Sequence, residues 1–148
     1  MRNVDFDQMC VDVKHTLQNI QHMKSQKMTE YGLKGSTAHC LCCIAKSEHG
    51  LNAGELSDRL NIDKAQISRC MAELSDKGFV FRNEEGGKQY RQRYCLTESG
   101  YRVAEDIIKT STAIGDRVSL GIDAKDMLAF YRVWEILRHN SAELSGEK

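Results

Sequence analysis

Residues 51–100, LNAGELSDRLNIDKAQISRCMAELSDKGFVFRNEEGGKQYRQRYCLTESG, carry the most specific structural signals of the chain. It predicts a helix at 52–60, a turn at 61–63 and a second helix at 64–77. Asp63 stands where its carboxylate can cap the second helix, and Gly78 stands where that helix would end in a left-handed residue. Two helices joined by so short a turn have the outline of a helix-turn-helix, whose second helix enters the DNA major groove. Apolar residues of the second helix recur at helical spacing and are expected to face a core: Ile67, Cys70, Met71 and Leu74.

The outward face of the second helix carries polar residues that suit contact with DNA. Gln66 can pair bidentately with adenine and Arg69 with guanine, while Lys64 and Ser68 can hold phosphates. Ala65 lies in the same first turn, where the helix N-terminus itself favours a phosphate. We therefore predict that these five residues bind DNA. The alternative is that they are ordinary solvated positions, because many surface helices carry the same residue types.

A hairpin with an excess of positive charge follows Gly78. Strand-prone runs occupy residues 79–81 and 90–96, and a polar turn with two glycines lies between them at 84–88. Such a ribbon, called a wing beside a helix-turn-helix, can lie along the DNA backbone or reach the minor groove. The predicted DNA contacts of the wing are Lys88, Arg91 and Arg93. Together with Arg82 they outnumber the acidic residues of the segment, Glu84 and Glu85.

The sequence GELSDRLNIDKAQISRCMAELSDKGFVFR, followed by LTESG, resembles the winged helix-turn-helix of MarR-type transcription regulators. The family's wing usually carries an Asp-x-Arg where this chain has Lys88-Gln89-Tyr90, so Arg91 or Arg93 would take over the minor-groove contact. The positions that match the family pattern are Leu56, Leu60, Ser68, Arg69, Leu74, Lys77, Gly78, Leu96, Thr97, Glu98 and Gly100.

The resemblance implies a mainly α fold with a small β-wing. It also implies a homodimer, built from the N- and C-terminal helices, that binds a palindromic double-stranded DNA operator. Regulators of this kind are typically repressors that a small-molecule effector, often an aromatic acid, releases from DNA. These properties are expectations from the resemblance and not from the spacing of residues.

The segments outside residues 51–100 carry apolar stripes of their own. Helices are predicted at 5–31, at 38–47, from Thr97 to an interruption at 115–121, and at 124–140. We expect an N-terminal dimerisation helix within 1–35, the winged helix-turn-helix at 36–100, and C-terminal helices at 101–148 that complete the dimerisation region. Pairing the terminal helices across a two-fold axis would bury their stripes. The alternative is that they fold back on their own subunit.

The composition of the chain indicates how it could attract DNA and in which cellular compartment it is expected. The 148 residues include 21 basic and 21 acidic side chains, so attraction to DNA would come from locally segregated charge. No apolar run approaches the roughly 20 residues that span a bilayer, and no signal-peptide pattern opens the chain. We therefore expect a cytoplasmic protein without a membrane partner. Six cysteines without a secretory signal argue against a disulfide framework.

Cys40 and Cys43 form a C-x-x-C, which raises the question of metal or redox chemistry. A zinc site of that type needs a second pair of ligands with similar spacing, and Cys70 and Cys95 do not supply one, so packing in a core is favoured. A thioredoxin-type enzyme would place the motif beside a βαβ unit, and no strand precedes His39. No Ser-His-Asp grouping, P-loop or paired acid motif is present. We expect no enzyme, no metal and no cofactor.

His15 and His39 are the candidate effector-binding residues, because an imidazole can pair with a carboxylate, although each suits a plain surface or core position as well. Cys10 resembles the peroxide-sensing cysteine that some family members carry near the start of the first helix. The tyrosines of that branch are replaced here by Lys14 and Lys24. A regulator that senses oxidation at Cys10 is therefore the alternative function, and a winged-helix module that binds another protein is a further one.

Overall fold

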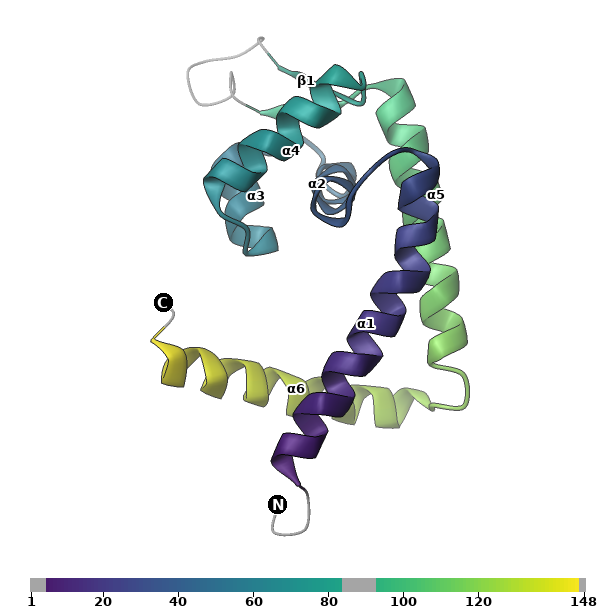
Figure 1. The fold of residues 1–148 in the computed structure, drawn as a ribbon, viewed down its shortest axis with the longest axis vertical. Helices are drawn as coiled ribbons and strands as arrows, with labels where there is room; N and C mark the ends of the chain where they lie inside the picture. Colours follow the sequence, from purple (N-terminus) through teal and green to yellow (C-terminus); the bar gives the residue numbers. More distant parts are fainter. Residues whose placement is uncertain (1–4, 84–92, 147–148) are drawn as a thin grey trace. The chain divides into compact units, whose positions relative to one another are not determined.

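The computed structural model describes residues 5–83 and 93–146. Within these ranges the chain is mainly helical and has one pair of short antiparallel strands (Figure 1). This confirms the predicted fold class. The elements, in chain order, are α1 (Phe6–Glu30), α2 (Gly35–Ala45), α3 (Ala53–Leu60), α4 (Lys64–Asp76), β1 (Val80–Arg82), β2 (Tyr94–Leu96), α5 (Glu98–Val118) and α6 (Ala124–Ser145).

The helix-turn-helix consists of α3 and α4, and local hydrogen bonds fix where each helix begins. Asn52 caps α3: its Oδ1 accepts from the Glu55 backbone N–H at 2.9 Å, and the Glu55 carboxylate accepts from the Asn52 backbone N–H at 2.9 Å. The turn passes through Asn61, which has a left-handed φ of 50°. Asp63 then caps α4 by accepting from the Gln66 backbone N–H at 2.9 Å, as the sequence predicted.

Helices α2, α3 and α4 form a lobe whose apolar core is centred on α2, and α3 and α4 lie on one side of that helix (Figure 1). All four apolar residues predicted to face inward from α4 are buried. Helix α1 contributes Met28, and the first half of α5 contributes Val103, Ala104 and Ile107. The core of the helix-turn-helix therefore includes residues on both sides of the 36–100 region.

Hydrogen bonds connect the start of α5 to the turn that follows α4. The Thr97 hydroxyl donates to the Gly78 carbonyl at 2.6 Å and accepts from the Gly100 backbone N–H at 3.0 Å. A Cβ atom on Gly100 would lie only 1.9 Å from the Phe79 carbonyl oxygen. Glycine is therefore required here by the close approach of two backbones, which gives the LTESG motif a physical reason.

The two strands form the base of the wing. Their antiparallel register pairs Val80 with Leu96 and Arg82 with Tyr94. On the other side of β2, Leu51 and Tyr94 exchange two backbone hydrogen bonds of 2.8 and 3.1 Å. Strand β2 therefore has backbone hydrogen-bond partners along both of its edges. Residues 84–92, which include the predicted turn and the first part of the predicted second strand, lie outside the described residues.

Several helices differ in length from the prediction. Helix α2 begins at Gly35 rather than at residue 38, and α6 continues to Ser145 rather than to residue 140. Helix α5 passes through Gly115 and ends at Val118, inside the run 115–121 where the sequence predicts that this helix is interrupted or ends. A glycine inside a helix costs only about 1 kcal/mol, which the neighbouring helical residues offset. The compact unit that holds the core ends at Ile114, and a second unit begins at Gly115.

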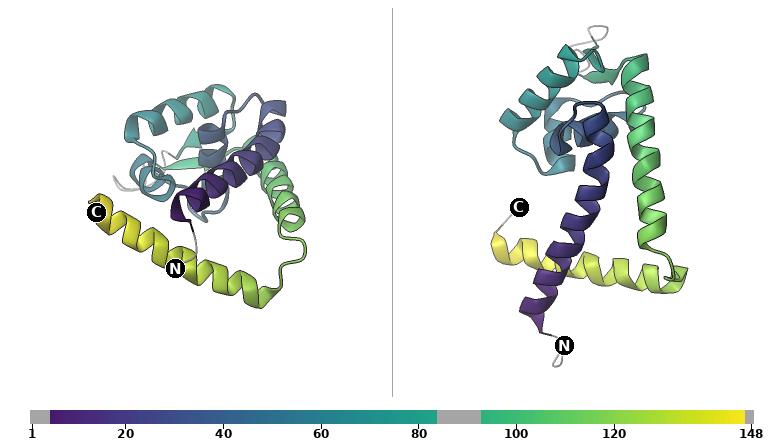
Figure 2. Two further views of the ribbon diagram at one scale, coloured as in Figure 1. Left: turned by 60° about the horizontal axis from the view of Figure 1, so that its bottom comes forward. Right: turned by 45° about the vertical axis from the view of Figure 1, so that its right-hand side comes forward.

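Helix α1 reaches the core only through its last turns, and Figure 2 shows it projecting from the lobe formed by α2, α3 and α4. Most of its apolar stripe is exposed, including Phe6, Val11, Val13 and Leu17.

Helix α6 belongs to the second unit and begins at Asp123, which caps it by accepting from the Asp126 backbone N–H at 2.7 Å. None of its residues is buried. The Phe130 and Trp134 rings stack on its surface with centroids 6.0 Å apart and an angle of 16° between their planes. Among the residues that the structure describes, no helix is long and apolar enough to cross a membrane.

Candidate nucleic-acid interface

The five residues of α4 that the sequence predicted as DNA contacts share its first two turns. Lys64, Ala65, Ser68 and Arg69 are exposed, and Gln66 is partly buried. The carboxylate of Asp63, the N-cap residue, already accepts a hydrogen bond from one of the free backbone N–H groups at this helix end. The positive side chains Lys64 and Arg69 therefore supply most of the attraction that this helix can exert on a phosphate.

Gln66 and Arg69 contact each other, which the helical spacing permits. The Arg69 Nη2 group donates to Gln66 Oε1 at 2.7 Å. The amide nitrogen of Gln66 points toward the core and donates to Cys70 Sγ at 3.9 Å. The two side chains that could read bases are therefore linked before any DNA is present.

Arg82 is placed at the base of the wing by an aromatic residue on the opposite strand. Its Nη2 group donates to the Tyr94 hydroxyl at 2.8 Å, and its guanidinium carbon lies 5.2 Å from the centre of the Tyr94 ring. The ring is largely buried, so it provides a fixed surface on which the exposed guanidinium rests. This contact fixes the position of one positive charge at the base of the wing.

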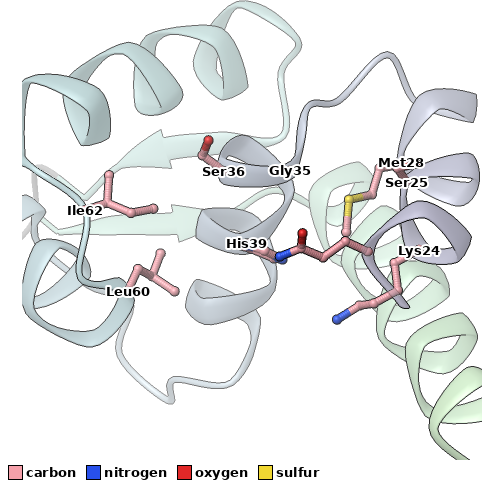
Figure 3. Close-up of a pocket in the computed structure, with 9 residues that line it drawn as sticks. Lys24, Ser25, Met28, Gly35, Ser36, His39, Leu60 and Ile62 are labelled. Carbon is pink, nitrogen blue, oxygen red and sulfur yellow. The ribbon is translucent and has the colours of Figure 1, made fainter. Parts of the chain in front are cut away.

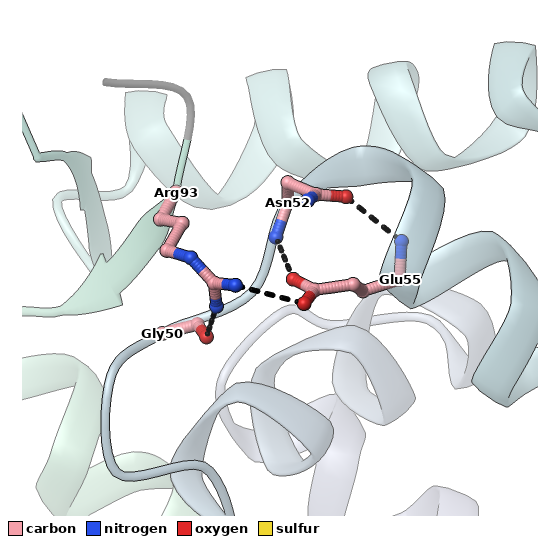
Figure 4. A network of polar contacts seen from close by, with 4 residues as sticks. All are labelled: Gly50, Asn52, Glu55 and Arg93. Atoms are coloured by element: carbon pink, nitrogen blue, oxygen red, sulfur yellow. Dashed lines mark hydrogen bonds and ion pairs between the residues drawn. The ribbon is translucent and has the colours of Figure 1, made fainter. Parts of the chain in front are cut away.

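The placement of Arg93 corrects the prediction that it contacts DNA from the wing, because its guanidinium is used in contacts within the chain. Figure 4 shows its guanidinium turned toward the start of α3, where it donates to the Gly50 carbonyl at 2.7 Å and to Glu55 Oε1 at 2.9 Å. Its side chain is only 20% exposed. The reason is the capping carboxylate of Glu55, whose charge attracts the nearby guanidinium. Lys88 and Arg91 lie outside the described residues.

The pKa of Glu55 is lowered because its carboxylate accepts from the Asn52 backbone N–H and faces Arg93. A carboxyl with a lowered pKa in the folded state adds stability above its unfolded pKa, near 4.3, and loses it as the pH falls through the folded value. We expect Glu55→Gln to lower the free energy of unfolding by about 0.5–1 kcal/mol at pH 7, and this difference to shrink below about pH 4.

Urea unfolding followed by circular dichroism at several pH values measures this difference. Glu98→Gln is the matched control, because the Glu98–Arg102 pair is exposed on both sides and its loss should change stability little. A Glu55→Gln variant that is as stable as the unaltered chain at pH 7 would contradict the role assigned to this network.

Two adjoining cavities lie beside α2 within the first unit. The first, drawn in Figure 3, has a volume of about 460 Å³. The second, of about 390 Å³, extends toward α5. The first is lined by Gln21, Lys24, Ser25, Met28, Gly35, Ser36, His39, Leu60 and Ile62. The second shares Lys24, Met28, His39 and Leu60 with it and adds Cys42, Cys43, Lys46, Ile107, Ile108, Ser111 and Thr112.

Lys24 is the cation common to both cavities. It is partly buried, and it has no hydrogen bond or ion pair within residues 5–83 and 93–146. Lys27, one turn onward, differs because it pairs with Asp106 at 2.7 Å and with Glu30 at 2.8 Å. A partly desolvated ammonium without a carboxylate partner is available to a bound anion. In the sequence, Lys24 stands out only as the replacement of a tyrosine that some MarR-type regulators carry.

Of the two histidines predicted to bind an effector, only His39 lines the cavities. Its pKa is lowered because the surrounding protein removes part of its water and because Lys24 repels a second positive charge. His15 is exposed on α1 and lines neither cavity. The uncapped start of α2, at Gly35 and Ser36, lies at the first cavity as well and adds partial positive charge there.

The cysteines divide by burial. Cys40 and Cys70 pack in the core, as expected for the first of them, and burial raises the pKa of Cys40 to about 12. Cys10 is exposed on α1. Among the described residues, no group of three or more histidine, cysteine or acidic side chains is placed to hold a metal ion.

Comparison with known proteins relates this geometry to other chains. The family model described as the sugar-specific transcriptional regulator TrmB matches residues 28–98. A comparison with curated proteins found no match. A MarR transcriptional regulator from Methanosarcina mazei Go1 has a similar structure, with a TM-score of 0.76 and 25% identity over 95% of this chain and 94% of that one.

Two further solved structures share the fold. A MarR-family regulator from Silicibacter pomeroyi has a TM-score of 0.73 and 23% identity, and the alignment covers 86% of each chain. CouR from Rhodococcus jostii RHA1, solved bound to p-coumaroyl-CoA, has a TM-score of 0.71 and 18% identity over 96% of this chain and 94% of its own.

The fold and these likenesses define a protein of the winged helix-turn-helix class of transcription regulators. Within that class the predicted resemblance to the MarR family is confirmed: the chain is similar in fold to MarR-family regulators over nearly its whole length.

Proposed function

We propose that this protein is a sequence-specific transcriptional regulator, acting as a repressor, that binds a palindromic operator as a homodimer and leaves it when a small molecule binds. The observation that carries the DNA-binding part is the exposed start of α4 with Lys64, Ser68 and Arg69 on it. In a helix-turn-helix this end of the second helix contacts base edges, and the lysine and serine suit phosphates. Arg82, Lys88 and Arg91 are the proposed contacts of the wing.

Selection from random duplex DNA with the full chain tests this proposal. We expect enrichment of a palindromic sequence and a logarithm of affinity that falls linearly with the logarithm of salt, with a slope of about −0.9 for each phosphate neutralised. Failure to enrich any sequence would contradict the proposal and favour a winged-helix module that binds another protein.

The homodimer is proposed from the apolar side chains that the terminal helices leave exposed. Helix α1 exposes four large apolar side chains in its first half, and α6 exposes Leu128, Phe130, Tyr131, Val133, Trp134 and Ile136. A monomer rarely leaves so much apolar surface in contact with water. Pairing these faces across a two-fold axis would cover them, and the resulting symmetry would match a palindromic operator.

The effector site is proposed in the cavities beside α2. Lys24, His39 and the start of α2 favour a negative group, while Met28, Leu60 and other apolar residues suit the body of an organic molecule. An organic anion, such as an aromatic carboxylate, has both features. Leu60 and Ile62 belong to the end of α3 and the turn before α4, so an occupant of the first cavity would touch the helix-turn-helix itself. CouR, a protein of the same fold, is bound to p-coumaroyl-CoA in its crystal structure.

We expect Lys24→Met to make operator binding less sensitive to benzoate, used as the probe, by tenfold or more in concentration, because a charge-assisted hydrogen bond would be lost. Fluorescence anisotropy of labelled operator measures the release. Lys14→Met, on the exposed part of α1, is the control, and neutral benzamide should release little protein. Equal sensitivity of the Lys24→Met and unaltered chains would remove Lys24 from the site. Release by a hydroperoxide that Cys10→Ser abolishes would favour oxidation sensing instead.

A further inference from the structure

The two polar ends of the Gln66 side chain are both engaged inside the protein. Its Oε1 accepts from Arg69 Nη2 at 2.7 Å, and its Nε2 donates to Cys70 Sγ at 3.9 Å. An adenine is recognised by glutamine through the same two atoms: the oxygen accepts from N6 and the nitrogen donates to N7. Each of these atoms keeps one further lone pair or N–H group. The amide nitrogen is turned toward the buried Cys70, however, so reading adenine with both atoms at once would require the Gln66 side chain to turn away from the core.

Arg69 has no such conflict. Its guanidinium has five N–H groups, and the bond to Gln66 uses one of them. Recognition of guanine O6 and N7 needs two donors, so Arg69 can keep its contact with Gln66 while it reads a guanine. A neutral acceptor on one edge also restricts the plane of the guanidinium, which lowers the entropy lost when the arginine meets a base.

The contact that holds Gln66 leads into the core. Cys70 is buried, and its sulfur also lies 3.6 Å from the hydroxyl of Thr37 on α2. Thr37 is itself only 3% exposed and donates to Glu73 Oε2 on α4 at 2.9 Å. The sulfur contacts are weak, but the atoms that make them are fixed by packing between α2 and α4. Gln66 therefore bridges an immobile part of the core and an exposed arginine.

We infer that Arg69 is the residue of this pair that reads a base, and that Gln66 is a positioning residue that sets the orientation of the Arg69 guanidinium. The inference rests on the proposed function, because it assigns roles within the proposed DNA-reading helix. It differs from what residue types alone favoured, which was adenine recognition by Gln66.

Base preferences measured by selection from random duplexes test these roles in four variants of the full chain. Arg69→Ala should flatten the preference for one G·C pair in each half-site by about tenfold to a hundredfold. Gln66→Ala should weaken preference at that same pair, by about three- to tenfold, and leave the A·T positions unchanged. The double variant should be no less selective than Arg69→Ala alone. Gln66→Glu, which keeps the acceptor and lacks the amide donor, should restore the preference for G·C.

Lys64→Ala is the control for the selection, because loss of a phosphate contact should weaken binding equally on all sequences. Flattening of an A·T position by both Gln66 variants, with the Arg69 position intact, would overturn the inference while leaving the regulator in place. Additive losses in the double variant would overturn it as well. A flat profile from the unaltered chain would overturn the proposed function, and this inference would fall with it.

Discussion

Gly100→Ala is expected to destabilise the protein by about 3 kcal/mol or more, which is enough to leave much of a small domain unfolded. The added methyl group would lie 1.9 Å from the Phe79 carbonyl oxygen and 2.7 Å from its carbon, far inside van der Waals contact. Neither backbone can yield easily, because Thr97 and Ser99 both donate to Gly78 in the adjoining turn. Separating the backbones would therefore break the bonds that join α5 to α4.

Gly115→Ala is the matched control for this substitution, since Gly115 lies in the same helix with no atom within 4 Å of the added Cβ position. There alanine should stabilise the helix by about 0.5–1 kcal/mol. Thermal unfolding followed by circular dichroism compares the two variants. Equal stability of Gly100→Ala and the unaltered chain would show that the close approach to Phe79 is not maintained in solution.

Replacing Phe130 and Trp134 together by glutamate is expected to convert the proposed dimer to monomers and to weaken operator binding by about a hundredfold or more. The two rings stack on one face of α6 and are 58% and 41% exposed, so a charge there leaves the fold of the chain intact. Four added carboxylates across a two-fold interface would be desolvated without partners, which strongly disfavours association. A monomer binds one half-site at a time, so it loses the gain in affinity that comes from binding two linked half-sites together.

Sedimentation velocity measures the association state, and anisotropy of labelled operator measures the affinity. His49→Glu is the control, because it adds charge at an exposed residue between α2 and α3, outside both terminal helices. If the double variant sediments as the unaltered chain does, the dimer interface lies elsewhere. A monomeric double variant that binds operator with full affinity would contradict the proposal that both half-sites are read by one dimer.

The sequence was most informative where structure depends on near neighbours. The Asp63 cap, the left-handed Gly78 and the buried stripe of α4 follow from residue types spaced one helical turn apart, and all three are found. Helix ends were predicted less well. Helix α2 begins at Gly35 rather than at residue 38, and α6 continues to Ser145 rather than to residue 140. The end of α5 at Val118, by contrast, falls inside the predicted run 115–121.

The roles of individual site residues were harder to predict because they depend on partners far along the chain. Arg93 is a predicted DNA contact because it lies in the basic second strand of the wing, yet Glu55, 38 residues earlier, draws its guanidinium inward. A sequence signal for this existed: Asn52 and Glu55 have the spacing of a capping box, which fixes where that carboxylate lies. Lys24 carried no comparable signal, because its importance lies in the absence of a partner among the described residues around the cavities.

The helix-turn-helix and its apolar face could be predicted from residues 51–100 alone, because helical periodicity and capping are local properties of the chain. The resemblance to MarR-type regulators lies in the same residues. Three features emerge only when the chain is folded: Gly100 meets the Phe79 backbone, Arg93 forms hydrogen bonds inside the protein, and Gln66 contacts Arg69 and Cys70. These contacts arise when α2, α4 and β2 pack around one core. The direction of a polar side chain is then set by the charges and hydrogen-bonding groups that packing brings within reach.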